Sequence, residues 1–333
     1  MSLKESAKKK SKESASTELQ SEIAKLKRDI EKQRREVAAA NLRAEEAESL
    51  IRDFHNSNFE IPKQKRRKAL KRGAKILVAF GDTHGCSLDP KCWAAFLADV
   101  EHLKPQNVIH GGDILDADGF LAQHHTTNYL AQTEYSYADE ICASNQLLDQ
   151  LQAVCPKSRI EIIQGNHDLR IETWALTTTQ KHKADAKLLL DLVGPKTMLN
   201  LDKRGIEWHS RGDCHDDAVA GGTIKRGNCY FTHPQKRGGV NAARKMISSF
   251  KKNTVYFHVH RRDYATTSDV TGDEWGAWCP GCMCVKRKYW HHSDHFEHSQ
   301  GYHLQIVSPD GDFLGINVPI INGKSLMTSM LKM

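Results

Sequence analysis

Five short apolar runs in this chain end on glycine, asparagine, aspartate or histidine. They are AKILVAF followed by GDTHG (74–85), QNVIHGGD (106–113), RIEIIQGNHD (159–168), NCYFTHP (228–234) and NTVYFHVH (253–260). Helix-like segments alternate with them, at residues 93–103, 137–154, 182–193 and 240–250. Strands that alternate with helices predict a layered α/β fold, in which ligands gather beyond the carboxyl ends of the strands.

The polar side chains at these strand ends are of the types that bind metals. One Asp-x-His turn alone is more often a surface turn than a ligand pair, but this set comes from five strand ends: Asp82, His84, Asp113, Asn166, His167, His233, His258 and His260. Carboxylate, imidazole and carboxamide groups suit manganese, iron or zinc, and the set is large enough for two divalent ions. Residues 258 and 260 alternate along a strand, so both can face one site only if the chain bends there.

In this order, GDTHG, GGD, GNHD, the histidine of THP, and HVH resemble the five motifs of the calcineurin-like metallophosphoesterase superfamily, over roughly residues 74–320. The resemblance implies a four-layer αββα sandwich with two metal ions at the strand ends. It implies that one ion is held by Asp82, His84 and His260. The other would be held by Asn166, His233 and His258, with Asp113 bridging the two. Manganese is the expected metal, with iron, zinc or magnesium as alternatives.

The resemblance also implies a metal-dependent phosphoric ester hydrolase. Two ions about 3.5–4 Å apart clamp the attacking and leaving oxygens of an in-line displacement, and water between them becomes hydroxide near neutral pH. His167 would protonate the leaving oxygen. Asp116 is expected to orient His167, and Asp168 is the alternative.

The substrate is less constrained than the chemistry. Protein phosphatases of the superfamily read Gly-Asp-x-x-Asp-Arg-Gly, and Ala117 replaces that arginine here. The chain resembles bacteriophage-type and DNA-repair-nuclease-like members more closely, which favours hydrolysis of nucleic acid phosphodiesters. A phosphomonoesterase, a nucleotide phosphodiesterase and a non-catalytic nucleic-acid- or protein-binding module remain alternatives. The candidate substrate-binding residues are Arg170, Arg261 and Arg262.

The N-terminal part has a different composition from the rest. Residues 1–18 are expected to form a disordered basic tail, residues 19–55 a coiled-coil helix and residues 56–73 a basic linker before the metallophosphoesterase domain, residues 74–333. The helix carries a heptad pattern over residues 19–51 that predicts a homo-oligomer: Leu19, Ile23, Leu26, Ile30, Gln33, Val37, Ala40, Ala44, Ala47 and Ile51. One amphipathic helix packed on its own domain is the alternative.

The positive charge is concentrated in the same part. Residues 1–73 hold 20 Lys and Arg against 12 Asp and Glu, whereas the whole chain holds 48 against 41, so the remainder is 28 against 29. The basic run Lys63–Arg72 is either a solvated linker or a contact for the phosphate backbone of a nucleic acid. With no apolar stretch after the first lysines and no membrane-length apolar window, the expected location is the cytoplasm.

Two further motifs lie near the C-terminus. The nine cysteines are scattered and odd in number, which indicates reduced thiols. Cys279, Cys282 and Cys284 in WCPGCMC are expected to be buried thiols around a Pro-Gly turn, with a zinc knuckle as the alternative. The alternating residues on both sides of SPDGD predict a β-hairpin.

Overall fold

The computed structural model describes residues 29, 31–39, 41–42, 45, 73–118, 136–212, 221–234, 238–286 and 298–331. The chain divides into two units, Met1–Ile61 and Pro62–Met333. In the first unit the described residues are helical and exposed. The predicted tail lies wholly outside the described residues, and so does the basic run of residues 63–72. The predicted coiled coil lies mostly outside them. Within the described ranges, no helix combines the length and apolar composition of a membrane span.

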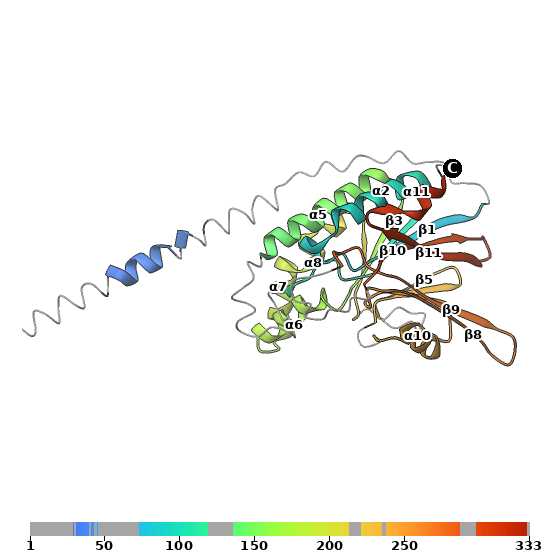
Figure 1. Cartoon of the computed structure of the whole chain (residues 1–333). Coiled ribbons are helices and arrows are strands. Elements are labelled where there is room, and N and C mark those ends of the chain that lie inside the picture. Colours follow the sequence, from blue (N-terminus) through green and yellow to red (C-terminus); the bar gives the residue numbers. More distant parts are fainter. Residues whose placement is uncertain are drawn as a thin grey trace, which may run out of the picture. The chain divides into compact units, whose positions relative to one another are not determined.

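The second unit contains a seven-stranded mixed sheet (Figure 1). In spatial order its strands are β12 (Lys324–Ser325), β11 (Phe313–Ile321), β10 (Gln300–Val307), β1 (Lys75–Phe80), β2 (Asn107–His110), β3 (Arg159–Ile163) and β4 (Glu207–His209). Strands β1 to β4 are parallel, and β10 pairs antiparallel with β1. The predicted hairpin is confirmed, because β10 and β11 pair antiparallel with Val307 opposite Phe313.

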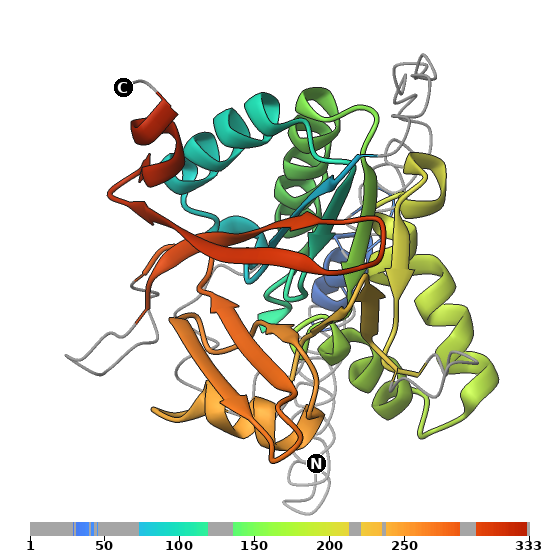
Figure 2. The ribbon, with the colours of Figure 1, turned by 90° about the vertical axis from the view of Figure 1, so that its right-hand side faces the viewer.

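A second mixed sheet of five strands faces the first (Figure 2). Its strands in spatial order are β5 (Thr223–Arg226), β6 (Cys229–Thr232), β7 (Thr254–Tyr256), β9 (Glu274–Pro280) and β8 (Arg262–Ser268). Strands β6, β7 and β9 are parallel to one another. The sequence predicts β6 and β7. It does not predict β4, β5 or β8, which are three to seven residues long and have no clear apolar alternation.

Helices cover the outer face of each sheet, as Figure 1 shows. The helices of the second unit, among the described residues, are η1 (Gly85–Ser87), α2 (Pro90–Leu103), α5 (Tyr137–Val154), α6 (Leu169–Thr178), α7 (Lys183–Val193), α8 (Pro195–Met198), α9 (Leu201–Arg204), α10 (Ala242–Phe250) and α11 (Leu326–Leu331). Helix α2 contacts α5 and strands β10 to β12, and α10 contacts β7 to β9. The predicted α/β class is confirmed, with two mixed sheets between helices.

The space between the sheets is filled by apolar side chains from both. Leu77, Ala79 and Ile109 of the first sheet pack with Phe231 and Phe257 of the second. Each side chain of this size that is fully removed from water contributes about 1.5–3 kcal/mol to stability. Strand side chains alternate between the two faces, so the residues next to Leu77 and Ala79 on β1 face the helices instead.

Local sequence signals begin the two helices on the outer face of the first sheet. The Asp89 carboxylate accepts hydrogen bonds from the backbone N–H groups of Lys91 and Cys92 at the start of α2. The Ser136 hydroxyl accepts one from the Asp139 N–H at the start of α5. Such caps satisfy backbone donors that the helix itself leaves unpaired. The predicted helix at 137–154 matches α5 at both ends.

Candidate metal centre

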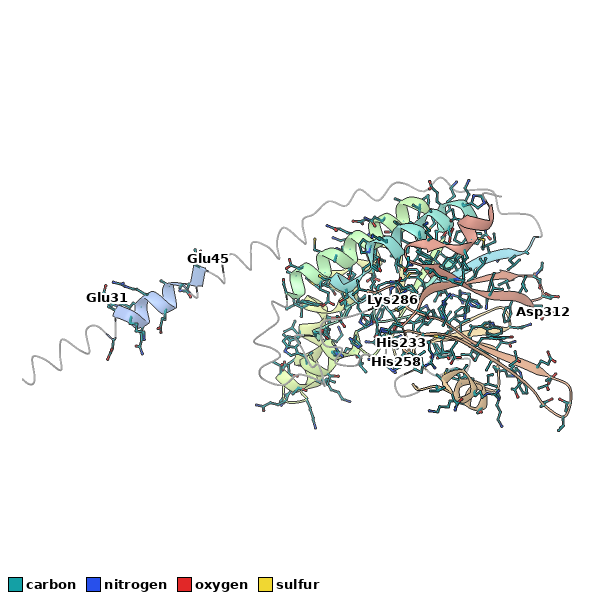
Figure 3. The ribbon with its side chains drawn as sticks, in the orientation of Figure 1. Glu31, Glu45, His233, His258, Lys286 and Asp312 are labelled. Atoms are coloured by element: carbon teal, nitrogen blue, oxygen red, sulfur yellow. The ribbon has the colours of Figure 1, made fainter. Side chains whose placement is uncertain are left out.

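The candidate ligands follow β1, β2 and β3 of the first sheet and β6 and β7 of the second. Neighbouring parallel strands end at the same edge of a sheet, so their loops meet there. Figure 3 shows His233 and His258, which follow β6 and β7, close together, and their ring centroids are 5.4 Å apart. The two sheets face each other, so Asp82, which follows β1, and His260, which lies beyond β7, also meet in one cluster.

The backbone turns sharply at most of these positions. Five candidate ligands have positive φ: Asp82 (54°), His84 (53°), Asp113 (52°), His258 (84°) and His260 (54°). Residues with side chains rarely adopt this region, and when they do they are often at functional sites. Strand β7 ends at Tyr256, so both histidines lie beyond the strand end, where a bend is needed for them to face one site. The bend that follows turns both histidines inward.

One group of potential ligand atoms contains Asp82, His84, Asp113 and His260, which lie within 4.8 Å of one another. His260 Nε2 lies 3.2 Å from Asp82 Oδ1 and 3.0 Å from His84 Nε2. His84 Nε2 lies 3.9 Å from Asp113 Oδ2. Three of these side chains are almost completely buried, and His260 is partly buried.

A second group contains Asp113, His233 and His258, so Asp113 belongs to both. His233 Nε2 lies 3.2 Å from Asp113 Oδ2 and 2.9 Å from Asn166 Oδ1. His258 Nδ1 lies 2.6 Å from the same Asn166 oxygen. The other ring nitrogen of His233 lies 2.8 Å from the Gly111 carbonyl oxygen, to which it donates. That contact leaves Nε2 available as a ligand atom.

His167 and Asp116 lie beside the first group. His167 Nδ1 is 2.8 Å from Asp116 Oδ1, and His84 Nδ1 is also 2.8 Å from it. Arg170 donates to Asp118 Oδ1 at 2.7 Å, and its Nη2 lies 3.2 Å from His167 Nε2. Asp116 and Asp168 are the two candidate partners of His167. The carboxylate of Asp116 is in contact with the His167 imidazole.

Asp168 contacts the backbone of the ligand loops. Its buried carboxylate accepts hydrogen bonds from the backbone N–H groups of Gly165, Asp113 and Leu115, at 2.8–3.0 Å. These contacts hold the loop after β2 against the loop after β3. Burial, followed by the charge of Asp113, raises the pKa of Asp168 to about 7.

Glu140 on α5 is a supporting residue that the sequence analysis missed. Its buried carboxylate accepts from the backbone N–H groups of Asp116 and Ala117. The sequence shows it only as an acid in the first turn of a helix, where acids are common because they complement the helix dipole. Its role in the loop after β2 becomes visible only when that loop packs against the helix.

The charges of the first group are strongly coupled. Burial disfavours the charged form of Asp82, but the adjacent His260 outweighs burial and lowers the pKa of Asp82 to about 2. Burial would lower the pKa of His260, but Asp82 raises it to about 10. In the second group burial, and then His233, lower the pKa of His258 to about 4. Asp82 is thus ionised beside a protonated His260, and a cation bound here would take the place of the proton on the imidazole.

The residues present fit divalent cations. Asp82 Oδ1 is buried and has no hydrogen-bond partner within the described part of the chain, although His260 Nε2 is nearby. The protonated His260 compensates this buried negative charge, and a divalent cation bound to the oxygen would do so in its place. Imidazole nitrogens and carboxylate oxygens, with one amide oxygen, are ligands that first-row divalent ions accept.

The remaining predicted residues make other contacts. Arg261 donates to the Gly239 carbonyl oxygen at 2.9 Å. The side chain of Arg262 runs past Gly281 and Gly301, and its Nε is buried without a hydrogen-bond partner among the described residues. Of the three arginines, Arg170 is the one whose described contacts place it against His167.

The three cysteines of WCPGCMC are buried thiols, as expected around a turn. Cys279 packs with apolar side chains of α10. Cys284 instead lies beside His84 and His260. Within the described residues, Cys279, Cys282 and Cys284 do not form a shared ligand group. The histidines at 291, 292 and 295 lie outside those residues.

No family model and no curated protein matches the chain. Solved structures similar to it include a single mutant of Vps29 from Entamoeba histolytica, with 11% identity, a TM-score of 0.37, and coverage of 75% of this chain and 95% of that one. Another is Vacuolar Protein Sorting 29 from Cryptosporidium parvum, with 10% identity, a TM-score of 0.36, and coverage of 76% and 95%. YfcE, a phosphoesterase from E. coli, has 13% identity, a TM-score of 0.31, and coverage of 73% and 98%. These TM-scores are too low to carry an argument about activity.

Fold and site together define a mixed α/β protein with a cluster of possible metal ligands between two sheets.

Proposed function

We propose that this chain is a dinuclear metal-dependent phosphoesterase whose substrates are nucleic acid phosphodiesters. The observation that carries the proposal is the pair of ligand groups that share Asp113. Asp82, His84 and His260 would hold one ion, and Asn166, His233 and His258 the other. Bound there, the ions would supply Lewis-acid chemistry: they would polarise the phosphoester and lower the pKa of a water molecule.

The protein's own residues would position and protonate the leaving group. Asp116 Oδ1 accepts a hydrogen bond from His167 Nδ1 and so holds the ring in one orientation. In this structure Arg170 Nη2 donates to His167 Nε2, so this nitrogen is an acceptor. As a general acid, His167 would first take up a proton on Nε2 in place of that contact and would then deliver it to the leaving oxygen. Arg170, 3.2 Å from this nitrogen, would stabilise negative charge on the phosphoryl group.

Two sequence features support a nucleic acid substrate. The N-terminal 73 residues carry 20 basic against 12 acidic residues, which suits a polyanionic partner. Ala117 stands where superfamily protein phosphatases carry a phosphate-gripping arginine. We further propose that residues 63–72 contact the phosphate backbone, and that manganese is the metal of the second group.

The proposal is tested with His167→Ala, assayed in Mn²⁺ against bis-p-nitrophenyl phosphate, p-nitrophenyl phosphate, and single- and double-stranded DNA. We expect kcat for the diesters to fall about 10²–10⁴-fold, the range typical of a lost general acid, with metal content unchanged. His182→Ala is the control, because this exposed histidine precedes α7.

Each outcome distinguishes the alternatives. Wild-type activity on the monoester alone would exclude the nuclease and indicate a phosphatase. Activity on bis-p-nitrophenyl phosphate without cleavage of DNA would indicate a nucleotide phosphodiesterase. A wild-type protein that binds metal and hydrolyses none of the four would indicate a binding module.

A further inference from the structure

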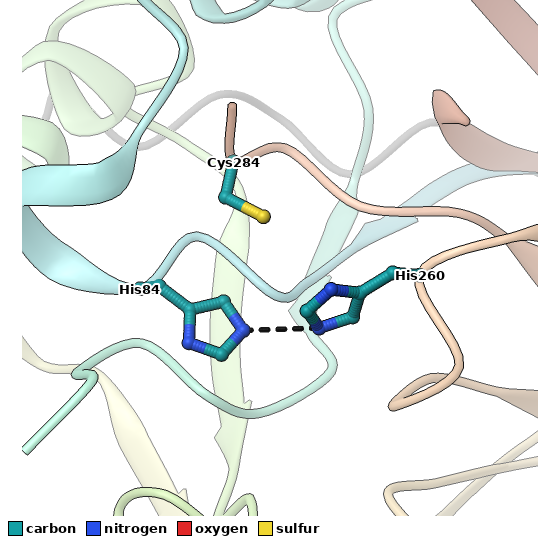
Figure 4. Close-up of side chains that lie close together, drawn as sticks. All are labelled: His84, His260 and Cys284. Atoms are coloured by element: carbon teal, nitrogen blue, oxygen red, sulfur yellow. Dashed lines mark hydrogen bonds between the residues drawn. The ribbon is translucent and has the colours of Figure 1, made fainter. Parts of the chain in front are cut away.

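We propose that Cys284 is a thiolate ligand of the first metal position, beside Asp82, His84 and His260. This inference rests on the proposed dinuclear centre and deepens it by adding a ligand of a different chemical class. The Cys284 sulfur and the ligand nitrogens of His84 and His260 all lie within 4.8 Å of one another. Figure 4 shows the sulfur directed toward the space beside the two facing imidazoles.

The distances among the nitrogen and oxygen ligand atoms next to Cys284 are those of ligands around one ion. His84 Nε2 and His260 Nε2 are 3.0 Å apart, and His260 Nε2 is 3.2 Å from Asp82 Oδ1. Zinc–nitrogen bonds of 2.0–2.1 Å in a tetrahedron place two ligand nitrogens about 3.3 Å apart. The buried Asp82 Oδ1, which has no hydrogen-bond partner among the described residues, is a second observation that indicates a cation here.

The backbone holds Cys284 in this position. Its N–H donates to the Asp82 carbonyl oxygen at 3.1 Å, so the cysteine is tied directly to the turn that carries the first ligand. Its own carbonyl oxygen accepts from Gln300 Nε2 at 2.9 Å. It also forms an isolated β-bridge with Leu88. A ligand whose backbone is hydrogen-bonded on both sides needs little rearrangement to bind.

The neighbouring side chains distinguish this thiol from an ordinary core cysteine. Cys279, Cys282 and Cys284 are all fully buried, but Cys279 packs among the apolar residues of α10. Cys282 Sγ lies 3.8 Å from the Cys284 carbonyl oxygen and belongs to no ligand group among the described residues. Cys284 instead lies against the two imidazoles of His84 and His260, which are metal-ligand groups and not apolar packing partners.

A thiolate changes which metal the first position selects. Carboxylate and water ligands suit manganese and magnesium, whereas thiolate ligands favour zinc and other softer ions. On binding, the Cys284 thiol loses its proton to solvent and the sulfur lone pair forms the bond to the ion. The two positions then differ: the first has sulfur, nitrogen and oxygen ligands, and the second has nitrogen and oxygen only.

The test is the absorption spectrum of the cobalt-loaded full-length protein in oxygen-free buffer with a phosphine reductant. We expect a sulfur-to-cobalt charge-transfer band in the wild type, its loss in Cys284→Ser, and its retention in Cys282→Ser, the matched control. Zinc affinity of Cys284→Ser should fall at least about tenfold, the lower end of losses seen when metal sites are disturbed. Cys284→Asp should shift the preference of the first position from zinc toward manganese.

The wild-type spectrum decides the matter even if a variant does not fold. If the wild type takes up cobalt and hydrolyses the diester without a sulfur band, the role of Cys284 is refuted and the proposed function stands. If the band is present and no phosphoester is hydrolysed, Cys284 is a ligand and the proposed function fails. A band that persists in folded Cys284→Ser refutes the cysteine assignment. Failure to bind any cobalt refutes both proposals.

Discussion

A methyl group at Gly165 would lie 2.1 Å from Oδ1 of Asp113 and 2.2 Å from the backbone nitrogen of the same residue. These distances are far below van der Waals contact, and one of the atoms belongs to the backbone. The glycine of GNHD therefore makes room for the carboxylate shared by both ligand groups. The close approach explains why a glycine stands here, which a turn alone would not require.

Gly165→Ala should weaken metal binding about 10–100-fold, because the added methyl group pushes Asp113 out of place. Metal content after dialysis and calorimetric titration measure the effect. Gly238→Ala is the control, since a side-chain carbon there would have nothing within 4 Å. Equal metal affinity in the two variants would mean that Asp113 is not a ligand.

His303 on β10 is a buried histidine away from the ligand groups. Its Nδ1 lies 2.9 Å from Asn317 Oδ1, and its Nε2 is buried without a hydrogen-bond partner among the described residues. Burial lowers the pKa of His303 to about 4, from an ordinary value of 6.5. The folded protein therefore keeps this ring neutral at a pH where the unfolded chain binds a proton.

The pH dependence of stability follows from this difference. Between pH 6.5 and pH 4 the unfolded state binds more protons, so the free energy of unfolding falls as the pH is lowered through that window. Between pH 7 and pH 5 His303 should account for a loss of about 2 kcal/mol. His303→Gln should reduce the loss by that amount in urea unfolding at both pH values, whereas His182→Gln should not. Parallel pH profiles for wild type and His303→Gln would contradict the prediction.

The first turn of α5 supports the loop that follows β2. Glu140 accepts hydrogen bonds from two backbone amides of this loop, at Asp116 and Ala117. Its carboxylate also stands close to Gly85, where a side-chain carbon would lie 2.4 Å from Glu140 Cγ. One helix residue thus holds the loop after β2 by hydrogen bonds and packs against Gly85 in the loop after β1.

Glu140→Gln should lower the free energy of unfolding by about 1.5–3 kcal/mol, because it replaces a charged acceptor of buried hydrogen bonds. Diester hydrolysis should also slow, since Asp116 would lose its fixed position beside His167. Asp139→Asn is the matched control: it lies in the same first turn of α5 but is exposed. Equal free energies of unfolding of the two variants in urea would show that the hydrogen bonds from Glu140 to the loop after β2 contribute little to stability.

The predicted helices and strands were most accurate where local signals were strong. Helix α5 matches its prediction at both ends, and β10 and β11 pair around SPDGD as expected. Strand β7 ends at Tyr256, and the backbone then bends, which is the condition for His258 and His260 to face one site. Local propensity cannot reveal such a bend, since other parts of the fold impose it.

The whole molecule has an uneven distribution of charge. The first 73 residues have an excess of eight positive charges (20 against 12), and the remainder has an excess of one negative charge (28 against 29). A domain that is nearly neutral gains little from long-range attraction to a polyanion. Any affinity for nucleic acid should then depend on the N-terminal part.

Removal of residues 1–73 should weaken DNA binding and flatten its dependence on salt by about one logarithmic unit per lost phosphate contact. Hydrolysis of bis-p-nitrophenyl phosphate should be unchanged, because every candidate ligand lies after residue 73. Binding titrations from 50 to 200 mM salt, a range over which phosphate contacts are strongly weakened, measure the effect. An unchanged slope would show that the basic run is only a linker.

The same truncation tests the predicted coiled coil. Full-length protein should sediment as an oligomer, and residues 74–333 as a monomer, if the heptad pattern of residues 19–51 pairs between chains. A full-length monomer would favour the alternative of a helix packed on its own domain.

The sequence by itself determined which residue types end the strands and in what order, because glycine, aspartate and histidine interrupt apolar runs that local periodicity already marks. That was enough to predict the α/β class and to name the residues of the candidate centre. Only the tertiary structure decided how these residues meet. The left-handed turns at Asp82, His258 and their neighbours, and the contacts of Glu140 and Cys284, depend on strands and helices that are far apart in the sequence. Contacts between distant segments leave no local pattern in the sequence, because tertiary packing creates them and the helix or strand propensity of single residues does not.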